Sequence, residues 1–537
     1  MSRQSERLFA AIGGVDDRAV DEAAQAMEKK RPFRWQRLTA LAAALLLVAG
    51  AGFLLLPRGG GAGGAGSSGS TFMSYAGPVM PLALREENGS ITARREITLD
   101  FAPWIPVWIS NEEEAAGRGG LPPEARQEVL EDYDKWYPEG GHYEYSNDIL
   151  VTDAYTLTNV SSRDQTVSVL YPFAASAQEL DVLRPTLSLE GRELDTVLRP
   201  GGYSGGFNGA WGSRREGLPE ENLAQAENWE AYRAVLSDGS YREAALADFP
   251  ELSGIPVVVY RFTDPWVSDP DPEIDRLNYT IRASFLLEQG KSSVLTTGFH
   301  GGTWDVESGA MTQSFTIPRE DWPQREGYRL VVLGEDVREL TVQVYDAGGP
   351  EGGNVVTNAG VTVERYESDL ETVLGEMAWE LLRARDWPEE LYGLYFGLMK
   401  DELAAYYQIL SDDPALRYAD SVISEGDLDF ASVDRVFYLE AEVTVPAGGS
   451  VTLTAEMAKS ASFDFHCTNT ANRDVYGYDL VTRLGSNLTF TGQTARLEDR
   501  GQIEIIRENF GFDLINGVSA VTLDPVQEHY YLEVRRK

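Results

Sequence analysis

The residues Gly202-Tyr203-Ser204-Gly205-Gly206 match the G-x-S-x-G pattern of serine hydrolases. That chemistry needs a strand entering a sharp turn and a helix leaving it, so that the serine hydroxyl is exposed as a nucleophile. The flanking segments 199–201 and 207–209 are both typical of loops. His300 is the one base that could serve Ser204, and no spacing brings the two together. The pattern therefore favours a glycine-rich turn over a catalytic serine.

Histidine and cysteine do not form a recognisable metal site. The single cysteine, Cys467, excludes an intramolecular disulfide, and no histidine lies at a zinc-site spacing from it or from another histidine. His466 and Cys467 are adjacent, and adjacent side chains on a strand point to opposite faces, so we expect Cys467 to be a small core residue. The sequence therefore predicts no catalytic residue, no metal ligand and no cofactor among the four histidines His142, His300, His466 and His529.

Carboxylates are abundant. The segment from Asp264 to Asp275 offers the oxygen ligands that calcium prefers, but it lacks the glycine and the terminal glutamate of an EF-hand, so we expect a solvated acidic loop. A pair of carboxylates flanking a glycosidic bond stays open as an alternative. Seventy-nine acidic residues follow residue 58, and any two of them could converge in a hydrolase.

Aromatic residues crowd one stretch of about forty residues. If their rings are exposed, they could stack on sugars or on a peptide; if they are buried, they form part of the core between sheets. The buried arrangement is the favoured interpretation. The residues are Trp104, Trp108, Tyr133, Trp136, Tyr137, Tyr143 and Tyr145.

The net charge of −39 over 537 residues limits the possible partners. A surface this acidic repels nucleic-acid phosphate and anionic lipid, so we predict no nucleic-acid binding. Solubility, or the habit of a secreted or halotolerant proteome, explains the acidity more simply than binding of cations or basic partners does. The hydrophobic content of 43% allows a large core, and the length has room for about three domains.

The segment Leu38–Leu56 contains no charged residue and predicts a single transmembrane helix. Nineteen helical residues rise about 28 Å, close to the roughly 30 Å hydrocarbon core. The net charge is +2 over residues 1–37 and −42 after residue 58, so the positive-inside rule places the N-terminus in the cytoplasm. A cleaved signal peptide is the main alternative, disfavoured by the long polar stretch before the helix, and a buried core helix is the third.

Residues 1–37 predict a cytoplasmic stub of two short helices. A pair this short is marginal in water, so it could fold on a cytoplasmic protein partner such as a sigma factor. A frayed tail that only sets the topology is the favoured alternative. The Gly/Ser-rich residues 57–71 then form a flexible linker.

Residues 72–345 show period-two alternation broken by turns, which predicts a β-rich ectodomain of short antiparallel strands. A proline-bounded helical segment at Leu121–Gly141 and a helical insertion at about 220–249 interrupt it. A hairpin turn is expected at Glu190-Gly191-Arg192. Strands are expected at Val257–Phe262, Tyr279–Leu287, Ser293–Gly298, Gln313–Ile317, Leu330–Leu333 and Leu340–Tyr345.

A helical hairpin is predicted at 362–413, with Ser368 and Glu371 forming a capping box. Residues 430–537 return to strands and predict a C-terminal β-sandwich. Its clearest hairpin joins the strand Phe437–Val445 to the strand Val451–Met457. The predicted fold class is therefore mainly β with helical insertions: a single transmembrane helix followed by β-sandwich-like ectodomains and a helical hairpin.

The N-terminal layout resembles that of single-pass extracytoplasmic proteins of clostridial-type Gram-positive bacteria. The resemblance covers about 60 residues: the stub Leu8–Asp17, a basic stretch, one helix and a large ectodomain. Some proteins with a similar stub are similar to anti-sigma factors, although the His/Cys zinc site of many anti-sigma domains is absent here. The resemblance implies a cell-membrane location, and it supplies no activity for the ectodomain, which is similar to an uncharacterised family.

Two functions follow as expectations. The first is a membrane-anchored extracytoplasmic binding, sensor or structural protein, held by Leu38–Leu56, whose ectodomain binds an unidentified ligand. The alternative is a membrane-anchored, glycosidase-like hydrolase acting on envelope or extracellular polysaccharide. Two acids about 5–10 Å apart in an aromatic-lined cleft would favour the hydrolase.

Overall fold

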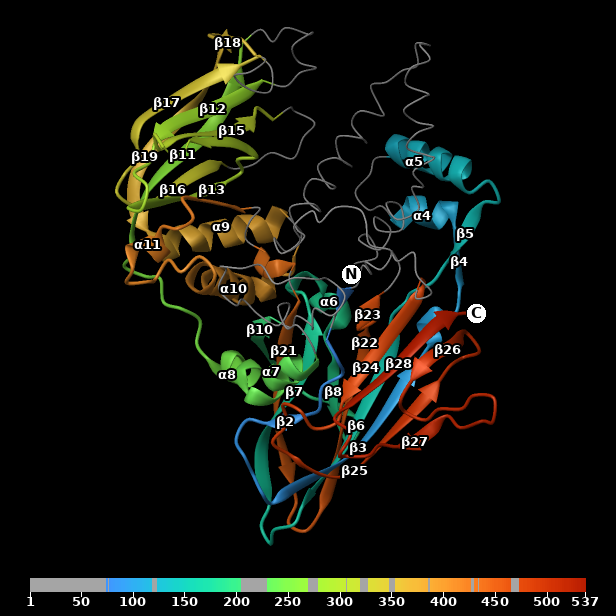
Figure 1. Cartoon of the computed structure of the whole chain (residues 1–537). Helices are drawn as coiled ribbons and strands as arrows, with labels where there is room; N and C mark the ends of the chain where they lie inside the picture. The colour runs from blue at the N-terminus through green and yellow to red at the C-terminus, as the bar shows by residue number, and fades with distance from the viewer. Residues whose placement is uncertain are drawn as a thin grey trace. The chain divides into compact units, whose positions relative to one another are not determined.

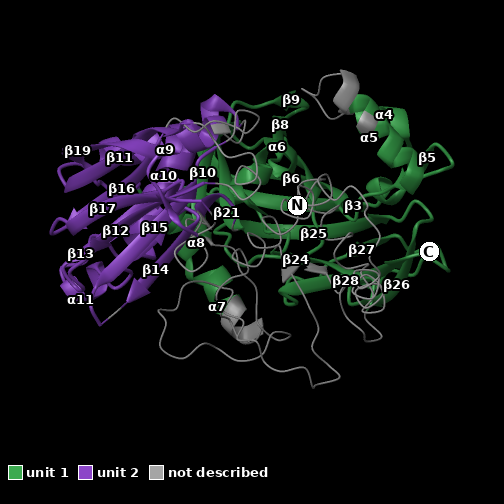
Figure 2. Ribbon diagram, turned by 90° about the horizontal axis from the view of Figure 1, so that it is seen from above, with its two compact units in different colours: residues 1–33, 59–247, 433–537 green, residues 34–58, 248–432 purple. Residues whose placement is uncertain are grey.

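The computed structural model describes residues 74–75, 77–117, 123–203, 229–268, 279–305, 307–318, 327–346, 353–384, 387–425, 429–432, 434–464 and 473–537. These residues form two compact units, coloured green and purple in Figure 2. Among the described residues, the first unit takes in 74–247 and 434–537, and the second takes in 248–432. The second unit is therefore inserted, in sequence, between two halves of the first.

The first unit is mostly β structure (Figure 1). Its strands in the three larger sheets are β1 (Ser74–Tyr75), β2 (Ala83–Leu84), β3 (Ile91–Asp100), β6 (Ile149–Asn159), β7 (Gln165–Ala175), β8 (Thr186–Leu189), β9 (Arg192–Glu193), β10 (Val197–Tyr203), β21 (Arg435–Val445), β22 (Ser450–Lys459), β23 (Phe463–Asp464), β24 (Val475–Val481), β25 (Thr489–Glu498), β26 (Ile503–Glu508), β27 (Ala520–Thr522) and β28 (His529–Arg536).

Strands from both ends of the sequence share these sheets. The seven-stranded sheet has the order β27-β25-β3-β6-β22-β8-β9, the four-stranded sheet β10-β21-β7-β2, and the five-stranded sheet β1-β23-β24-β28-β26. All pairs are antiparallel except β25 with β3. The strands after residue 430, expected to form a sandwich of their own, therefore pair directly with strands that precede residue 204.

The clearest hairpin predicted from the sequence is wrong. β21 and β22 follow one another around the turn at Pro446, but β21 pairs with β7 and β10, whereas β22 pairs with β6 and β8. β6 and β7 are likewise consecutive in sequence and lie in different sheets. The two connections form stacked arches between the sheets, and their turns bond to each other: Gly448 donates its N–H to Ser161 and Ala447 donates to the Asp164 carboxylate. Alternation marks the strands correctly but does not say which strand is the partner.

The turn at Glu190-Gly191 confirms the other predicted hairpin, β8 with β9. Both residues have positive φ, 50° and 77°, as a two-residue turn of the primed type requires. The expected helical insertion contains α7 (Trp229–Asp238) and α8 (Ser240–Leu246), with a corner at Gly239, where φ is 87°. A short helix, α6 (Leu180–Leu183), follows β7.

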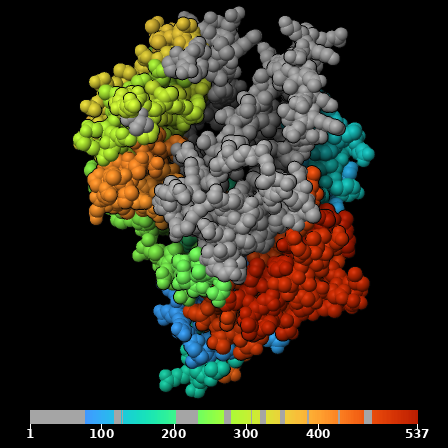
Figure 3. Space-filling view, in the orientation of Figure 1, coloured from blue at the N-terminus to red at the C-terminus, as the bar shows by residue number. Residues whose placement is uncertain are grey.

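An arm, formed by residues 105–117 and 123–148, extends from the sheets of the first unit (Figures 1 and 3). Its elements are β4 (Val107–Ser110), α4 (Asn111–Gly117), α5 (Pro123–Trp136) and β5 (Gly141–Glu144). α5 confirms the helical segment expected between Leu121 and Gly141. β4 and β5 pair only with each other, in antiparallel register.

The second unit contains two five-stranded sheets that pack face to face. Phe262, Ile281, Phe315 and Leu330 are fully buried in the core between them. The sheet orders are β19-β11-β16-β13-β20 and β14-β15-β12-β17-β18. The strands are β11 (Pro256–Val267), β12 (Thr280–Leu286), β13 (Ser292–Thr297), β14 (Gly301–Asp305), β15 (Ala310–Thr316), β16 (Tyr328–Gly334), β17 (Arg338–Tyr345), β18 (Val355–Val356), β19 (Ala359–Asp369) and β20 (Val422–Ser424).

Two helices of the second unit, α9 (Leu370–Ala384) and α10 (Tyr392–Ala405), lie within the range predicted for a helical hairpin, and a short α11 (Pro414–Arg417) follows. The predicted start at residue 362 is wrong, because residues 362–369 belong to β19. Buried Arg329 on β16 donates two 2.6 Å hydrogen bonds to Glu380, which joins α9 to the first of these sheets. The capping box is displaced by one residue. Asp369, rather than Ser368, accepts the N–H of Thr372, while Glu371 accepts the N–H of Leu252.

The predicted fold class included a transmembrane helix, and this part of the prediction is wrong. Within the ranges given above, no helix is long and apolar enough to cross a membrane. The longest, α9, has 15 residues and spans about 22 Å, short of the roughly 30 Å needed, and it carries Glu371, Glu376, Glu380 and Arg383. The segment Leu38–Leu56, the stub 1–37 and the linker 57–71 lie outside the described residues.

Candidate functional site

The arm carries a group of exposed aromatic side chains on its two-stranded sheet. Trp108 on β4 lies directly opposite Tyr143 on β5, and Tyr145 follows two residues later, just after the end of β5. Their exposed fractions are 42%, 65% and 48%. We call these three residues the aromatic face. Trp136, at the end of α5, is 80% exposed.

The expectation that this aromatic stretch is buried core is therefore wrong for four of its members and right for one. Trp104 is fully buried against Phe101 and Tyr478, where the arm leaves the sheets. Beyond that point the ribbon is only two strands wide, so no neighbouring sheet covers it. The exposed members are Trp108, Trp136, Tyr143 and Tyr145.

The rings of Trp108 and Tyr143 meet nearly at right angles. Their centroids are 5.1 Å apart and their planes are inclined by 73°, an edge-to-face contact that stabilises both rings without burying them. The two inclined ring planes form a corner.

Gly141 fixes the position of the Trp108 ring. A Cβ atom at this glycine would lie 2.8 Å from the Trp108 indole and would also collide with the Ile109 carbonyl oxygen. The indole therefore packs directly on the glycine backbone. The role of Gly141 could not have been identified from the sequence, because its contact with Trp108 depends on the register between β4 and β5.

Arg536, near the C-terminus, holds the other end of the face. Its guanidinium lies 3.6 Å from the Tyr145 ring centroid and 4.6 Å from that of Trp104. It also donates hydrogen bonds to the carbonyl oxygens of Trp104 and Ser146, the latter at 3.2 Å. Burial lowers the pKa of Arg536. The contacts join both strands at the base of the arm to β28.

The helices of the arm are fixed to the ribbon by polar and stacking contacts. Ser110 and Glu113 form a capping box at the start of α4: the Glu113 carboxylate accepts the Ser110 N–H at 2.9 Å, and the Ser110 hydroxyl accepts the Glu113 N–H at 3.2 Å. On the other side of the ribbon the His142 ring stacks on Tyr137, with centroids 4.1 Å apart. The S-x-x-E pattern at Ser110 was the one available sequence signal for this helix start.

The net charge of the arm is negative. Between residues 105 and 148 the chain has eleven acidic and three basic residues. One of the three, Lys135, is paired with Asp132 at 2.8 Å. Arg536, which bonds to two neutral carbonyl oxygens, adds one positive charge beside Tyr145. The arm as a whole therefore disfavours polymers that carry many carboxylate, phosphate or sulfate groups.

The structure does not assemble the other candidates into a site. His300 lies in the second unit, 3.2 Å from the Thr316 hydroxyl, and His529 lies 2.8 Å from the Asp479 carboxylate. Ser204, His466, Cys467 and residues 269–278 of the acidic loop lie outside the described residues. Within the part of the chain that the structure describes, no group of three or more His, Cys, Asp or Glu residues is placed to hold a metal ion.

A small cavity between α7, α8 and the four-stranded sheet gives no support to the hydrolase alternative. Its lining contains no carboxylate, whereas glycoside hydrolysis needs two. The lining residues are Met80, Pro81, Pro172, Val235, Leu236, Gly239, Tyr241, Arg242, Tyr438, Leu484 and Gly485.

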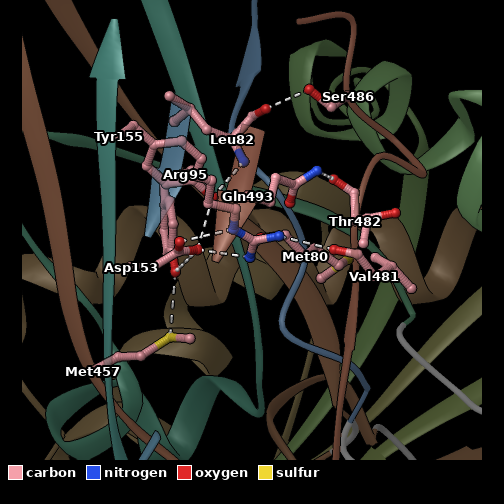
Figure 4. Close-up of polar contacts among 11 residues, drawn as sticks. Met80, Leu82, Arg95, Asp153, Tyr155, Met457, Val481, Thr482, Ser486 and Gln493 are labelled. Carbon is pink, nitrogen blue, oxygen red and sulfur yellow. Dashed lines mark hydrogen bonds and ion pairs between the residues drawn. The ribbon is translucent and has the colours of Figure 1, made fainter. Parts of the chain in front are cut away.

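A buried polar network in the first unit is structural (Figure 4). Arg95 on β3 and Asp153 on β6 form two 2.8 Å hydrogen bonds, and both side chains are fully buried. The Asp153 carboxylate also accepts the hydroxyls of Tyr155 at 2.7 Å and Tyr171 at 3.3 Å. Arg95 donates to the carbonyl oxygen of Val481 at 2.9 Å. With no exposed atom, the network cannot meet a ligand.

Sequence reasoning missed this network, although a signal was present. Arg95 is in phase with the inward-facing residues Ile97 and Leu99 of β3, and Asp153 is in phase with Val151 and Tyr155 of β6. A charged residue at an inward position on each of two strands predicts a buried pair.

No protein-family model matches the sequence, and no curated protein is significantly similar to it.

Proposed function

We propose that the protein is an extracytoplasmic binding protein whose aromatic face takes a neutral polysaccharide. The observation that carries the proposal is the exposure of Trp108, Tyr143 and Tyr145 on a ribbon that Gly141 and Arg536 hold in place. Aromatic rings stack on the apolar C–H faces of sugars, and rigid rings lose little conformational entropy on binding.

The surrounding charge supports a neutral ligand. A polyhydroxylated chain carries no charge for the eleven carboxylates of the arm to repel, whereas an anionic polymer would be repelled. Carboxylate oxygens on the arm can accept hydrogen bonds from sugar hydroxyls. A basic peptide would also suit the charge, but three aromatic rings favour a ligand with flat apolar faces, such as a sugar. Polymeric glycans are envelope or extracellular materials, which is why the proposal includes an extracytoplasmic location.

Replacing Trp108 should abolish most of the binding. Loss of about 100 Å² of apolar contact at roughly 25 cal/mol per Å² weakens binding by about 2.5 kcal/mol, a roughly 50-fold increase in Kd. The measurement is titration calorimetry of wild type and Trp108→Ala against neutral oligosaccharides of glucose, xylose and N-acetylglucosamine, with polygalacturonate as the anionic comparison.

Trp304→Ala is the matched control, because Trp304 has the same 42% exposure but lies on β14 of the second unit. It should bind like the wild type. Equal losses in both variants, tight binding of polygalacturonate, or no binding of any neutral sugar by the wild type would each contradict the proposal.

Gly141→Ala tests whether the position of the ring matters as well as its presence. The added methyl group must displace the indole or the ribbon backbone, so we expect affinity to fall about tenfold although every aromatic ring remains. Gly89→Ala is the control, since a Cβ there meets nothing within 4 Å. Calorimetry should be accompanied by tryptophan fluorescence, and unchanged affinity of Gly141→Ala would show that the indole needs no fixed position.

A further inference from the structure

We infer that the aromatic face binds a single glycan chain in solution and not the packed surface of an insoluble polysaccharide. The inference rests on the proposed function and specifies its ligand. It follows from the relative orientation of the rings, because a dissolved chain and a packed surface of the same polymer need different ring orientations.

A packed polysaccharide surface is flat, and rings that bind it must share one plane. The Trp108 and Tyr143 planes are inclined by 73°, so only one of the two rings can lie flat against such a surface while the other meets it edge-on. An isolated chain has no such restriction. One sugar unit can lie in the corner, stacked on the indole and touching the tyrosine ring with its edge.

The third ring extends the corner along the ribbon. Trp108 packs over Gly141 and lies opposite Tyr143 on β5, and Tyr145 follows directly after the end of β5, two residues beyond Tyr143. The face is therefore long in one direction and only two strands wide in the other. A narrow, linear surface fits one extended chain lying along β5.

Rigidity favours this ligand further. The Trp108 ring, one side of the corner, is fixed by Gly141, so it cannot readily turn to become coplanar with Tyr143. The Arg536 guanidinium, 3.6 Å from its centroid, fixes the third ring, Tyr145.

The test compares soluble and insoluble forms of each polymer with the full chain. The pairs are cellohexaose with microcrystalline cellulose, chitohexaose with crystalline chitin, and xylohexaose with insoluble xylan. Calorimetry gives the Kd for the soluble member, and depletion from the supernatant gives binding to the solid. We expect binding to at least one soluble member, with less than one tenth of that affinity for its insoluble partner.

Tyr143→Ala should weaken binding of the soluble chain at least tenfold, because it removes one side of the corner while Trp108 stays in place. Trp304→Ala should have no effect. Binding to the solid form with little or none to the soluble form, or unchanged soluble binding by Tyr143→Ala, would overturn the inference and leave the proposed function standing. Binding to neither form of any pair would overturn both.

Discussion

Asp153→Ala should destabilise the first unit by about 3–5 kcal/mol, the usual cost of removing one partner of a buried ion pair. The substitution leaves the Arg95 guanidinium in the interior without its counter-charge, and it removes the acceptor of the Tyr155 and Tyr171 hydroxyls. In the wild type Asp153 raises the pKa of Arg95 although burial acts to lower it. An arginine side chain keeps its proton in proteins, so without Asp153 the charge stays buried and uncompensated.

The measurement is urea unfolding of the full chain followed by far-UV circular dichroism, fitted with a separate transition for each unit. Glu96→Ala is the matched control. Glu96 lies next to Arg95 on β3 and pairs with Arg94 at 3.3 Å, but both side chains of that pair are about 60% exposed. The control should change the stability by less than about 0.5 kcal/mol. A loss below about 1 kcal/mol for Asp153→Ala would show that the network does not hold the sheets together.

Gly397→Ala should destabilise the second unit by about 2–3 kcal/mol, opposite in sign to what helix propensity predicts. Alanine is favoured over glycine inside a helix by about 1 kcal/mol. At this position of α10, however, a Cβ atom would overlap the ring of Phe249, which packs directly on the helix backbone. The ring must leave its place, and the contact area it loses outweighs the gain in propensity.

Gly393→Ala, in the first turn of the same helix, is the control for propensity. A Cβ at Gly393 meets nothing within 4 Å, so that variant should be unchanged or up to about 1 kcal/mol more stable. Thermal unfolding of the second-unit transition, with hydrogen exchange of the α10 amides, separates the two variants. If the two substitutions change the unfolding temperature equally, the contact between Phe249 and Gly397 does not contribute to stability.

Local features of the fold could be predicted from the sequence, because they depend on neighbours in the chain. The alternation in β11 and β12 and the apolar stripe of α9 are set by a period of two or 3.6 residues. The turn at Glu190-Gly191 is set by the backbone conformation of two residues. The predicted N-cap of α9 was wrong by one residue. Ser368 and Asp369 are both good N-cap residues, and only the path of β19 decides which of them caps the helix.

Features that depend on distant pairing could not be predicted. The strands on either side of Pro446 show the alternation of a hairpin, but whether they pair with each other or with β7 and β6 depends on segments almost 300 residues away. The same limit applies to the candidate site. Aromatic composition drew attention to residues 104–145, but Trp108 and Tyr143 are exposed because, in the part of the chain that the structure describes, no third strand joins β4 and β5.

The interleaving of the first unit also constrains how the chain can fold during synthesis. β6 is complete at residue 159, but its partner β22 begins only at Ser450. The buried network also needs the carbonyl oxygen of Val481, which lies 386 residues after Arg95 in the sequence. At about 5–20 residues per second, a ribosome needs roughly 20–80 s to cover that interval. During this time β3, β6 and β7 stand with unpaired edges, which invite aggregation. The second unit is contiguous in sequence and can fold before β22 is synthesised. The yield of native protein should therefore depend on how well the early strands of the first unit are protected from aggregation.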